Sequence, residues 1–174
     1  TDHMLETEEI LALIRNVNHD FLDIQERKEL LKKKKEELTG KLNVLEPFRS
    51  LELDVHKVLH YRYMHVRFGR IDVDHYQKLE KYLFDDLNAI FLEGTRNENY
   101  VYGCYFAANS DTSRVDAVFN SMHFERITVS DEYAGTPEIA CQSLSEEIEE
   151  TQEAIDQAEE DTRSLMESHG AELI

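Results

Sequence analysis

The chain has 174 residues, of which 37 are acidic and 19 are basic, so its formal net charge is −18 at pH 7. This length fits one domain with an appendage. The acidic balance argues against a nucleic acid or an anionic lipid surface as partner, because both attract a face rich in lysine and arginine. No window of about 18 apolar residues is present, so the sequence predicts no direct membrane insertion of this chain.

The start of the chain and its two cysteines give hints about targeting and about the redox compartment. Residues 1–4, TDHM, resemble a cloning remnant and are set aside from the fold, and the stretch after them has no signal-peptide hydrophobic core. Cys104 and Cys141 are isolated thiols without metal or redox spacing. This usage is typical of a reducing compartment and predicts no disulfide.

Residues 5–46 have the pattern of a long coiled-coil helix. Their apolar side chains recur in alternating steps of four and three residues over about five heptads. Lysines occupy the two core positions of the heptad pattern that are not apolar. Pro47 then ends the helix, because a proline disfavours the helical conformation of the residue before it. The predicted seam consists of Ile10, Ile14, Val17, Phe21, Ile24, Leu31, Leu38, Leu42 and Leu45, with Lys28 and Lys35 in the two remaining seats.

Residues 136–174 repeat this pattern more weakly. Thr136 can cap a helix whose first residue is Pro137, a position at which the missing N–H group costs nothing. Several heptad positions of the second seam hold small or polar residues, so this helix contributes little apolar surface to the contact. The seats are Cys141, Leu144, Ile148, Thr151, Ile155, Ala158, Thr162 and Leu165.

Opposite charges predict how the two helices meet. Residues 27–35 contain six basic side chains and one acidic, whereas residues 138–172 contain twelve acidic side chains and one basic. An antiparallel pairing with Leu45 near Ala140 places residues 28–35 opposite roughly residues 150–157, so that opposite charges flank the seam. We therefore expect an antiparallel coiled coil within a monomeric chain. Two independent solvated helices are the alternative interpretation.

The middle segment, residues 47–135, predicts an α+β domain. Apolar residues alternate in its strand-like stretches and follow helical spacing between them, which gives the order β-α-β-β-α-β. This order is typical of a ferredoxin-like lobe, one antiparallel sheet with both helices on one face, here inserted between the two long helices. The expected elements are strands at 60–68, 89–95, 100–107 and 124–129, a turn at 96–99, a helix at 73–89 capped by Asp72, and a helix after Ser110 or Asp111.

The inward positions of these elements form one predicted core. The strand positions come from the period of two and the helix positions from the period of 3.6 residues. The predicted core consists of Met64, Val66, Phe68, Leu79, Leu83, Leu87, Val115, Val118, Phe119, Met122, Ile127 and Val129.

Few residues have the spacing of a chemical site. His56 and His60 would share one face of a helix, as metal-binding histidines do, but no carboxylate or thiol nearby completes a third ligand. Cys104 lies inside a predicted strand, where a thiol usually packs as a small hydrophobic side chain. Asp85 and Asp86 are adjacent and point in different directions, so they form no acid–base pair.

The remaining polar residues and the glycines are dispersed. His65, His75 and His123 belong to different elements and have no partner nearby in the sequence. Gly69 and Gly103 are single glycines rather than a phosphate-binding run. We therefore predict no catalytic residue, no cofactor site, no metal site and no enzymatic activity of this chain.

Four tyrosines suggest one further possibility. Tyr61, Tyr63, Tyr100 and Tyr102 could form an aromatic sheet face of the kind that RNA-binding sheets use. The acidic charge and the missing basic rim argue against RNA. A contact with another protein, or packing at the edge of the sheet, is the favoured interpretation.

Six short segments of residues 45–140 have a resemblance to a known family. They are LEPFRSLELD at 45–54, VRFGRI at 66–71, KYLFDDL at 81–87, YVYGCYF at 100–106, SMHFERI at 121–127 and DEYAGTPEIA at 131–140. In this order they resemble the cytoplasmic part of V-type ATPase/ATP synthase subunit I, whose eukaryotic counterpart is subunit a. Asp72 stands where bacterial relatives often have a proline after FGRI, which still permits a helix to begin there. The two long helices resemble the family only in their coiled-coil character.

The resemblance implies a function for the whole chain. It would be the membrane-distal lobe of the cytoplasmic N-terminal region, with stubs of both coiled-coil helices, at the cytoplasmic face of the membrane. In this family the lobe docks the peripheral stalk, the E–G heterodimer, and the parent subunit is an integral membrane protein of an ion-translocating ATPase or ATP synthase. The membrane arginine of the family is absent, so no proton-translocating residue is assigned to this sequence.

Two other classes of protein remain compatible with the residues alone. A ferredoxin-like domain on a coiled coil could be a dimerisation or ligand-sensing module of a regulatory protein. An enzyme on the same fold would need a polar pocket with a nucleophile or a metal, which the sequence does not offer.

Overall fold

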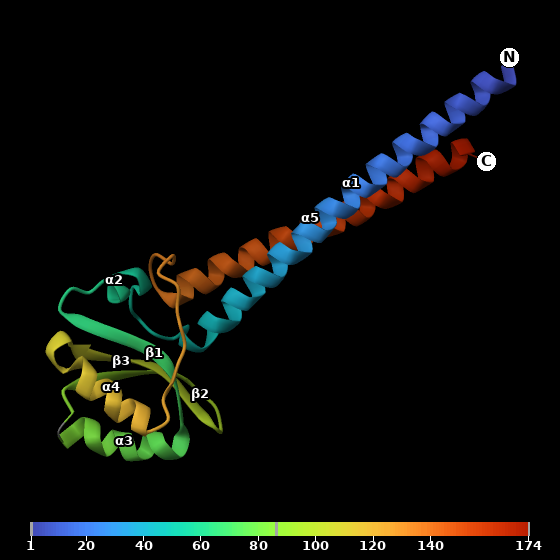
Figure 1. Cartoon of the computed structure of the whole chain (residues 1–174). Helices are drawn as coiled ribbons and strands as arrows, with labels where there is room; N and C mark the ends of the chain where they lie inside the picture. Colours follow the sequence, from blue (N-terminus) through green and yellow to red (C-terminus); the bar gives the residue numbers. More distant parts are fainter. Residues whose placement is uncertain (1, 86, 174) are drawn as a thin grey trace. The chain divides into compact units, whose positions relative to one another are not determined.

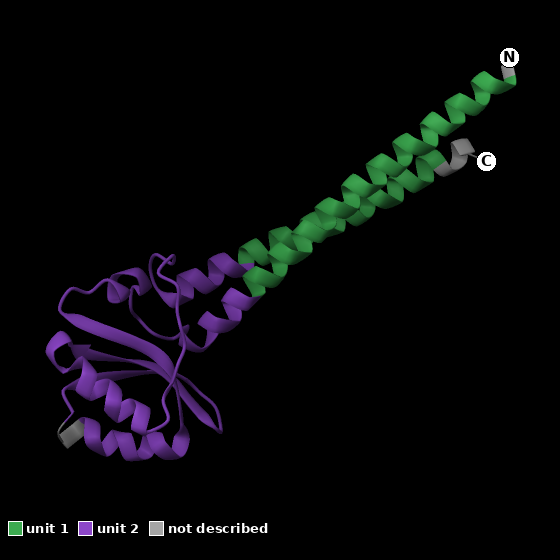
Figure 2. Cartoon of the chain, in the orientation of Figure 1, with its two compact units in different colours: residues 1–39, 146–174 green, residues 40–145 purple. Residues whose placement is uncertain are grey.

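The computed structural model describes residues 2–85 and 87–173 of the chain. These residues form two compact units (Figure 2). Unit 1 consists of Thr1–Thr39 and Glu146–Ile174, and unit 2 consists of Gly40–Ser145. Two long helices, α1 (Asp2–Leu45) and α5 (Pro137–Leu173), contribute to both units.

Within unit 1, α1 and α5 run antiparallel and side by side (Figure 1). Arg27 donates a hydrogen bond to Asp161 at 2.6 Å, and the ammonium group of Lys28 lies 3.2 Å from the carboxylate of Glu159. Further along, Lys35 donates to the side-chain oxygen of Gln152 at 2.6 Å. Contacts between basic residues of one helix and acidic residues of the other thus set the register, as the charge pattern predicts.

The observed register differs from the predicted one by two residues. Lys28 lies opposite Glu159, and Lys35 lies opposite Gln152. The lysines that interrupt the seam are half-buried and extend their charged ends to these polar partners, so their aliphatic stems cover the seam. Side-chain length allows this adjustment, because a lysine reaches a partner about one helical turn away.

Most predicted seam positions are shielded in unit 1, but two are not. Thr151, Ile155 and Ala158 of α5 are buried, and the hydroxyl of Thr151 donates to the carbonyl of Glu147 at 2.7 Å. Ile10 and Ile14 of α1, expected in the seam, are exposed. The predicted seam is therefore wrong at these two residues.

Unit 2 contains a four-stranded antiparallel sheet with the strand order β2-β3-β1-β4. The central strand β1 (Met64–Asp72) pairs along its whole length with β3 (Tyr100–Ala108), and Phe68 lies opposite Cys104. On the outer sides lie β2 (Ala89–Arg96) and β4 (Glu125–Arg126). The prediction of strands at these four places is therefore confirmed, with different ends.

Two helices cover one face of the sheet (Figure 1). They are α3 (Val73–Asp85) and α4 (Thr112–Ser121), and Phe119 of α4 stacks on Tyr105 of β3 with ring centres 3.7 Å apart. A 3-10 turn, η2 (Asn109–Asp111), precedes α4. The buried core on this face consists of Ile71, Tyr76, Leu79, Leu87, Val101, Tyr105, Ala107, Val115, Phe119 and Phe124.

The opposite face of the sheet is also covered, which the sequence did not predict. A 3-10 turn, η1 (Glu46–Phe48), and a short helix, α2 (Val55–Leu59), pack there. Phe48 is fully buried and its ring centre lies 5.3 Å from that of Phe68. Val66 and Phe68 therefore belong to this second core, and not to the core beneath the helices, because successive strand residues point to opposite faces.

Two strand ends differ from the predictions. β1 continues through Gly69 to Asp72, where the carboxylate of Asp72 caps α3 by accepting from the backbone N–H of His75 at 2.9 Å. The last strand is only two residues long, because the chain leaves the sheet after the backbone N–H of Ile127 bonds the carbonyl of Phe68 at 2.9 Å. The cap by Asp72 is confirmed, whereas the side chain of Asp111 makes no capping hydrogen bond to α4.

The helical pairing of unit 1 is testable by cross-linking. Cysteines introduced by Leu31→Cys and Ile155→Cys, in a chain in which Cys104 and Cys141 are replaced by serine, should form a disulfide within one chain, because the observed register brings these positions together. Non-reducing electrophoresis and mass spectrometry measure it. Cross-linking only between chains would contradict the intramolecular pairing, and Leu22→Cys with Ile155→Cys is the control that should not close.

The stability of unit 2 should depend strongly on Phe119. Phe119→Ala removes a fully buried ring that stacks on Tyr105, so we expect the free energy of unfolding to fall by about 3–5 kcal/mol. Urea titration followed by circular dichroism measures it. Tyr82→Ala on the exposed side of α3 is the control and should change the free energy by less than about 1 kcal/mol. A loss that small at Phe119 would refute the assigned core.

Candidate functional site

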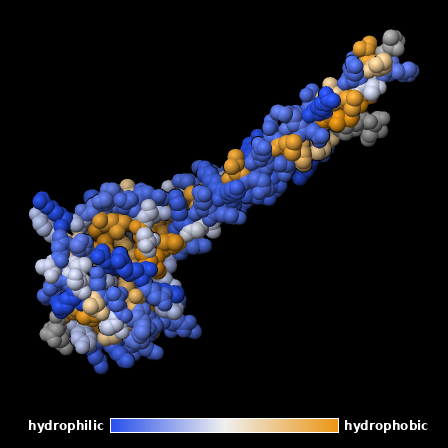
Figure 3. All heavy atoms as spheres, viewed as in Figure 1, coloured by the Kyte–Doolittle hydropathy of each residue, from blue (hydrophilic) through white to orange (hydrophobic). Residues whose placement is uncertain are grey.

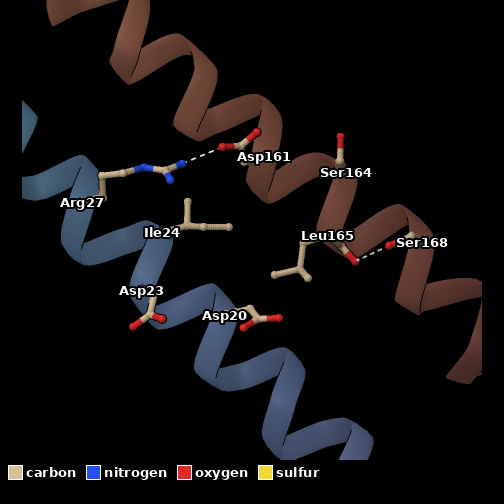
Figure 4. Close-up of a pocket in the computed structure, with 8 residues that line it drawn as sticks. All are labelled: Asp20, Asp23, Ile24, Arg27, Asp161, Ser164, Leu165 and Ser168. Atoms are coloured by element: carbon tan, nitrogen blue, oxygen red, sulfur yellow. Dashed lines mark hydrogen bonds and ion pairs between the residues drawn. The ribbon is translucent and has the colours of Figure 1, made fainter.

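An open groove of about 470 Å³ lies along the helical pair of unit 1 (Figure 4). Ile24 and Leu165 face each other across it, and the contact of Arg27 with Asp161 closes one end. Hydrogen bonds from Gln157 and Arg27 lower the pKa of the Asp161 carboxyl. The groove is lined by Asp20, Asp23, Ile24, Arg27, Asp161, Ser164, Leu165 and Ser168. The hydroxyl of Ser168 donates to the carbonyl of Leu165, so it is used in the helix.

One group of three possible metal ligands occurs among the residues that the structure describes. His19, Asp20 and Asp23 follow one another on α1, and Nδ1 of His19 lies 3.4 Å from a carboxylate oxygen of Asp23. All three side chains are at least 60% exposed. Water therefore competes fully for these groups, and such an exposed set does not by itself make a metal site.

Unit 2 contains a smaller, mainly apolar pocket of about 270 Å³. Its walls are the end of α1 and the segment that precedes α5, and Lys41 bridges to Glu132 at 3.0 Å between them. The lining residues are Gly40, Lys41, Val44, Leu45, Thr128, Val129, Ser130 and Tyr133. The pocket has an apolar floor, since Leu45 and Val129 are buried.

The structure brings a third residue to the histidine pair of α2. The rings of His56 and His60 lie 4.4 Å apart, and His60 Nε2 is 3.0 Å from a carboxylate oxygen of Asp131. His56 Nδ1 is 2.8 Å from the backbone carbonyl of the same residue. Asp131 is 71 positions away from His60, so no spacing rule identifies it. The two histidines thereby hold the segment before α5 against α2.

The other histidines also have partners that the sequence did not indicate. His65 Nδ1 lies 2.9 Å from the hydroxyl of Thr112, which joins β1 to α4. His75 Nδ1 lies 2.6 Å from Asp72, and the ring of His123 contacts the ring of His75 with centres 4.8 Å apart. His75 and His123 belong to different elements, as expected, although their rings meet. The expectation of no partner nearby in the sequence is wrong for His75, because Asp72 lies three residues before it.

The cysteines behave as core residues. Cys104 is fully buried between β1 and β2, and burial raises the pKa of its thiol to about 12. Burial also raises the pKa of Cys141. A thiol in this environment is protonated at neutral pH and is not nucleophilic.

Gly69 and Gly103 lie where neighbouring groups approach the sheet closely. The ring of Phe124 occupies the space where a side chain at Gly69 would lie, and the ring of Phe91 does so at Gly103. Both glycines thus allow close packing on the sheet. The prediction that Asp85 and Asp86 form no acid–base pair falls outside the described residues, which include neither Asp86 nor the side chain of Asp85.

The four tyrosines do not form one exposed aromatic face. Tyr102 packs against Phe48 with ring centres 6.3 Å apart, and the guanidinium of Arg70 lies 3.9 Å above the ring of Tyr100. Tyr61 packs near Phe106, whereas Tyr63 is 72% exposed. Internal packing therefore uses most of the rings that an RNA-binding sheet would leave free.

A partly buried polar network joins α4 to the sheet. The hydroxyl of Tyr105 donates to Asp116 at 2.6 Å, and Nε of Arg67 lies 3.6 Å from the same carboxylate. Burial and the neighbouring carboxylate raise the pKa of Tyr105. Nε of Arg67 is buried without a hydrogen bond and faces the Asp116 carboxylate, while Nη1 of the same guanidinium donates to the carbonyl of Val66 at 3.4 Å. We attribute a positioning role to this network, because each member holds another in place.

The polar side chains described above mainly connect one structural element to another. In the described part of the chain no helix is long and apolar enough to cross a membrane.

Comparisons with known proteins place this fold. No protein-family model matches the sequence, and no curated protein sequence matches it. Among solved structures, the chain is similar to the cytoplasmic N-terminal domain of subunit I of V-ATPase, a homolog of subunit a. The TM-score is 0.52 at 14% sequence identity, and the similarity covers 83% of this chain and 50% of that chain. The chain thus spans about half the length of its structural relative, and it shares the fold of the cytoplasmic N-terminal domain of V-ATPase subunit I.

Proposed function

We propose that this chain is a stator component of a rotary V-type ATPase or ATP synthase, and that its lobe docks the peripheral stalk. The observation that carries this proposal is the shared fold with the cytoplasmic domain of subunit I over 83% of the chain. The motifs of residues 45–140 resemble the same family through their sequence alone. Agreement between a sequence resemblance and a structural likeness supports the proposal more than either does alone.

The topology of unit 2 supports the proposal of a ferredoxin-like fold. The strand order β2-β3-β1-β4 with α3 and α4 on one face is the order that a β-α-β-β-α-β, ferredoxin-like lobe requires. The very short β4 and the covering of the second face by η1 and α2 are departures from the simplest form of that fold. We therefore propose a ferredoxin-like lobe with an added layer, inserted in a coiled coil.

The physical properties of the chain suit a part that resists force. A stator must carry torque without chemistry of its own, and two paired helices that are joined by ion pairs resist bending. The segments of unit 2 are likewise tied by ion pairs and hydrogen bonds, as in the contact of Arg49 with Glu138. We propose that the chain is not an enzyme and acts at the cytoplasmic face of the membrane.

The partner that the family resemblance supplies is the E–G heterodimer of the peripheral stalk. In Figure 3 most of the visible surface of unit 1 is hydrophilic with apolar side chains in separate spots, whereas a larger apolar area lies on unit 2. An exposed apolar area with a polar rim is typical of a protein-binding surface. We therefore propose that the stalk binds unit 2.

A dimerisation module is the second candidate, because one apolar site on α1 is left uncovered by the residues that the structure describes. Leu22 and Leu30 are more than half exposed and line a shallow groove of about 450 Å³ with Gln25, Glu26, Glu29 and Lys33. A second chain could cover this groove. Size-exclusion chromatography with light scattering distinguishes the two functions, since dimerisation predicts twice the chain mass.

The docking proposal predicts a measurable complex. Purified E–G heterodimer should shift backbone NMR signals of unit 2 and leave those near the end of α5 unchanged. The affinity should be modest, because this chain alone lacks the additional attachments that would add avidity. Isothermal titration gives the dissociation constant. The absence of any shift in unit 2 at E–G concentrations of about 1 mM would refute the docking role.

A further inference from the structure

The groove along the helical pair of unit 1 is open because one contact of the pairing is missing. Arg27 of α1 pairs with Asp161 of α5 at 2.6 Å beside the seam. One heptad further along, the same antiparallel register brings Asp20 and Ser168 to the two sides of the groove (Figure 4). The hydroxyl of Ser168 donates to the carbonyl of Leu165 within its own helix. Ser168 therefore gives Asp20 no cation, and the groove stays open there.

The floor of the groove is apolar. Ile24 and Leu165 face each other across it, and both are half-buried in unit 1. In a coiled coil, long polar side chains beside the seam normally cover such residues with their aliphatic stems. On the α5 side of this groove the short side chains of Ser164 and Ser168 take that place. A volume of about 470 Å³ is thus left beside the seam for apolar side chains from another molecule.

The rim of the groove on α1 carries two carboxylates without a strong cation. Asp20 and Asp23 are 60% and 65% exposed, and His19 lies 3.8 and 3.4 Å from them. Among the residues that the structure describes, no lysine or arginine comes within 4.0 Å of either carboxylate. A lysine or arginine from a partner would therefore displace no existing pair with such a residue.

The charge of unit 1 favours a basic partner. Residues 1–39 and 146–174 contain 21 acidic and eight basic side chains, so this unit carries 13 of the 18 net negative charges of the chain. Three of the basic side chains, Arg27, Lys28 and Lys35, already contact α5. A field of this sign attracts a positively charged partner and repels an acidic one. An apolar floor with an acidic rim is thus complementary to a basic amphipathic segment.

The form of the groove favours a helix as its occupant. The groove follows two helices that run antiparallel and side by side, and its apolar residues come from the seam between them (Figures 1 and 4). A third helix can place the apolar side chains of one face into such a groove, as in other complexes of a helix with a groove. An extended segment would find few backbone partners there, because the backbone groups of a helix interior already bond each other.

The other two grooves select an occupant less clearly. The apolar pocket of unit 2 has Lys41 in its wall, and this lysine already bridges to Glu132. The groove at Leu22 and Leu30 of α1 has both acidic and basic side chains around it. Charge therefore specifies the partner at neither place.

We propose that a basic amphipathic helix of another protein packs into the groove of unit 1 as a third helix. Its apolar side chains contact Ile24 and Leu165, and its lysine or arginine side chains pair with Asp20 and Asp23. This surface belongs to unit 1 alone, whereas the stalk is proposed to bind unit 2. The proposal does not rest on the stator role.

A synthetic peptide tests the proposal. It has about three heptads with leucine at positions a and d and lysine at e and g, and its lysines oppose pairing of the peptide with itself. Added to the full chain at neutral pH and low salt, it should shift backbone NMR signals of residues 20–27 and 161–168. Isothermal titration should give a dissociation constant that rises with ionic strength. A peptide with glutamate in place of the lysines is the control, and equal binding of it would contradict the charge argument.

Two double variants of equal charge assign the binding to one groove. Asp20→Asn with Asp23→Asn should weaken binding of the lysine peptide by about 3- to 30-fold, the range for two exposed ion pairs. Glu26→Gln with Glu29→Gln removes the same charge from the other groove of α1, so binding should change by less than about twofold. All four side chains are exposed, so circular dichroism should show the same helix content in both variants.

Ser168→Arg should supply the missing contact. An arginine at this position can pair with Asp20 and cover Leu165 with its stem, so the peptide should no longer bind. Met166→Arg adds the same charge to an exposed position of α5 outside the groove and should retain binding. Together the two variants separate closure of the groove from the added positive charge.

Four outcomes would overturn the proposal. One is the absence of any shift in unit 1 at peptide concentrations of about 1 mM. Another is a loss of binding in the glutamate double variant but not in the aspartate double variant. The third is wild-type binding by Ser168→Arg. The fourth is a dimer of the chain alone, seen by light scattering, whose interface contains Ile24 and Leu165, because a second copy would then occupy the groove.

Discussion

The two ends of an inserted lobe must meet, and in unit 2 a small set of contacts fulfils this constraint. Arg49, just after α1, forms a two-pronged hydrogen bond with Glu138 in the first turn of α5, at 2.5 and 3.2 Å. The backbone N–H of Val55 bonds the carbonyl of Gly135 at 2.9 Å. Because the chain leaves and returns at one place, the same two helices can pair again in unit 1. The sheet and the added layer of unit 2 lie between the two chain segments that this closure joins.

Much of the fold follows from local patterns. The heptads and the charge blocks predict antiparallel helices to within two residues of register, because the ion pairs that set it are encoded in each helix. The alternation of apolar and polar residues locates β1 and places Val66 and Phe68 on the same face of it. It does not say which layer covers that face. Phe48 supplies that layer from a stretch without a clear period, so its role depends on tertiary contacts.

The polar contacts of unit 2 were harder to predict for a physical reason. Asp131 reaches His60, and His123 reaches His75, only after the strands and helices have packed. No spacing along the chain encodes these pairs. By contrast, the cap of α3 by Asp72 and the cap of α5 by Thr136 are local, and both are present. Sequence patterns thus identify the local polar contacts and leave the long-range ones to the structure.

The sheet of unit 2 is covered by a different layer on each face. Phe119 of α4 stacks on Tyr105 on one face, whereas Phe48 packs against Phe68 on the other. Because successive strand residues point to opposite faces, each layer has its own set of buried side chains. A substitution in one layer therefore leaves the packing contacts of the other in place, and the two layers can be altered separately.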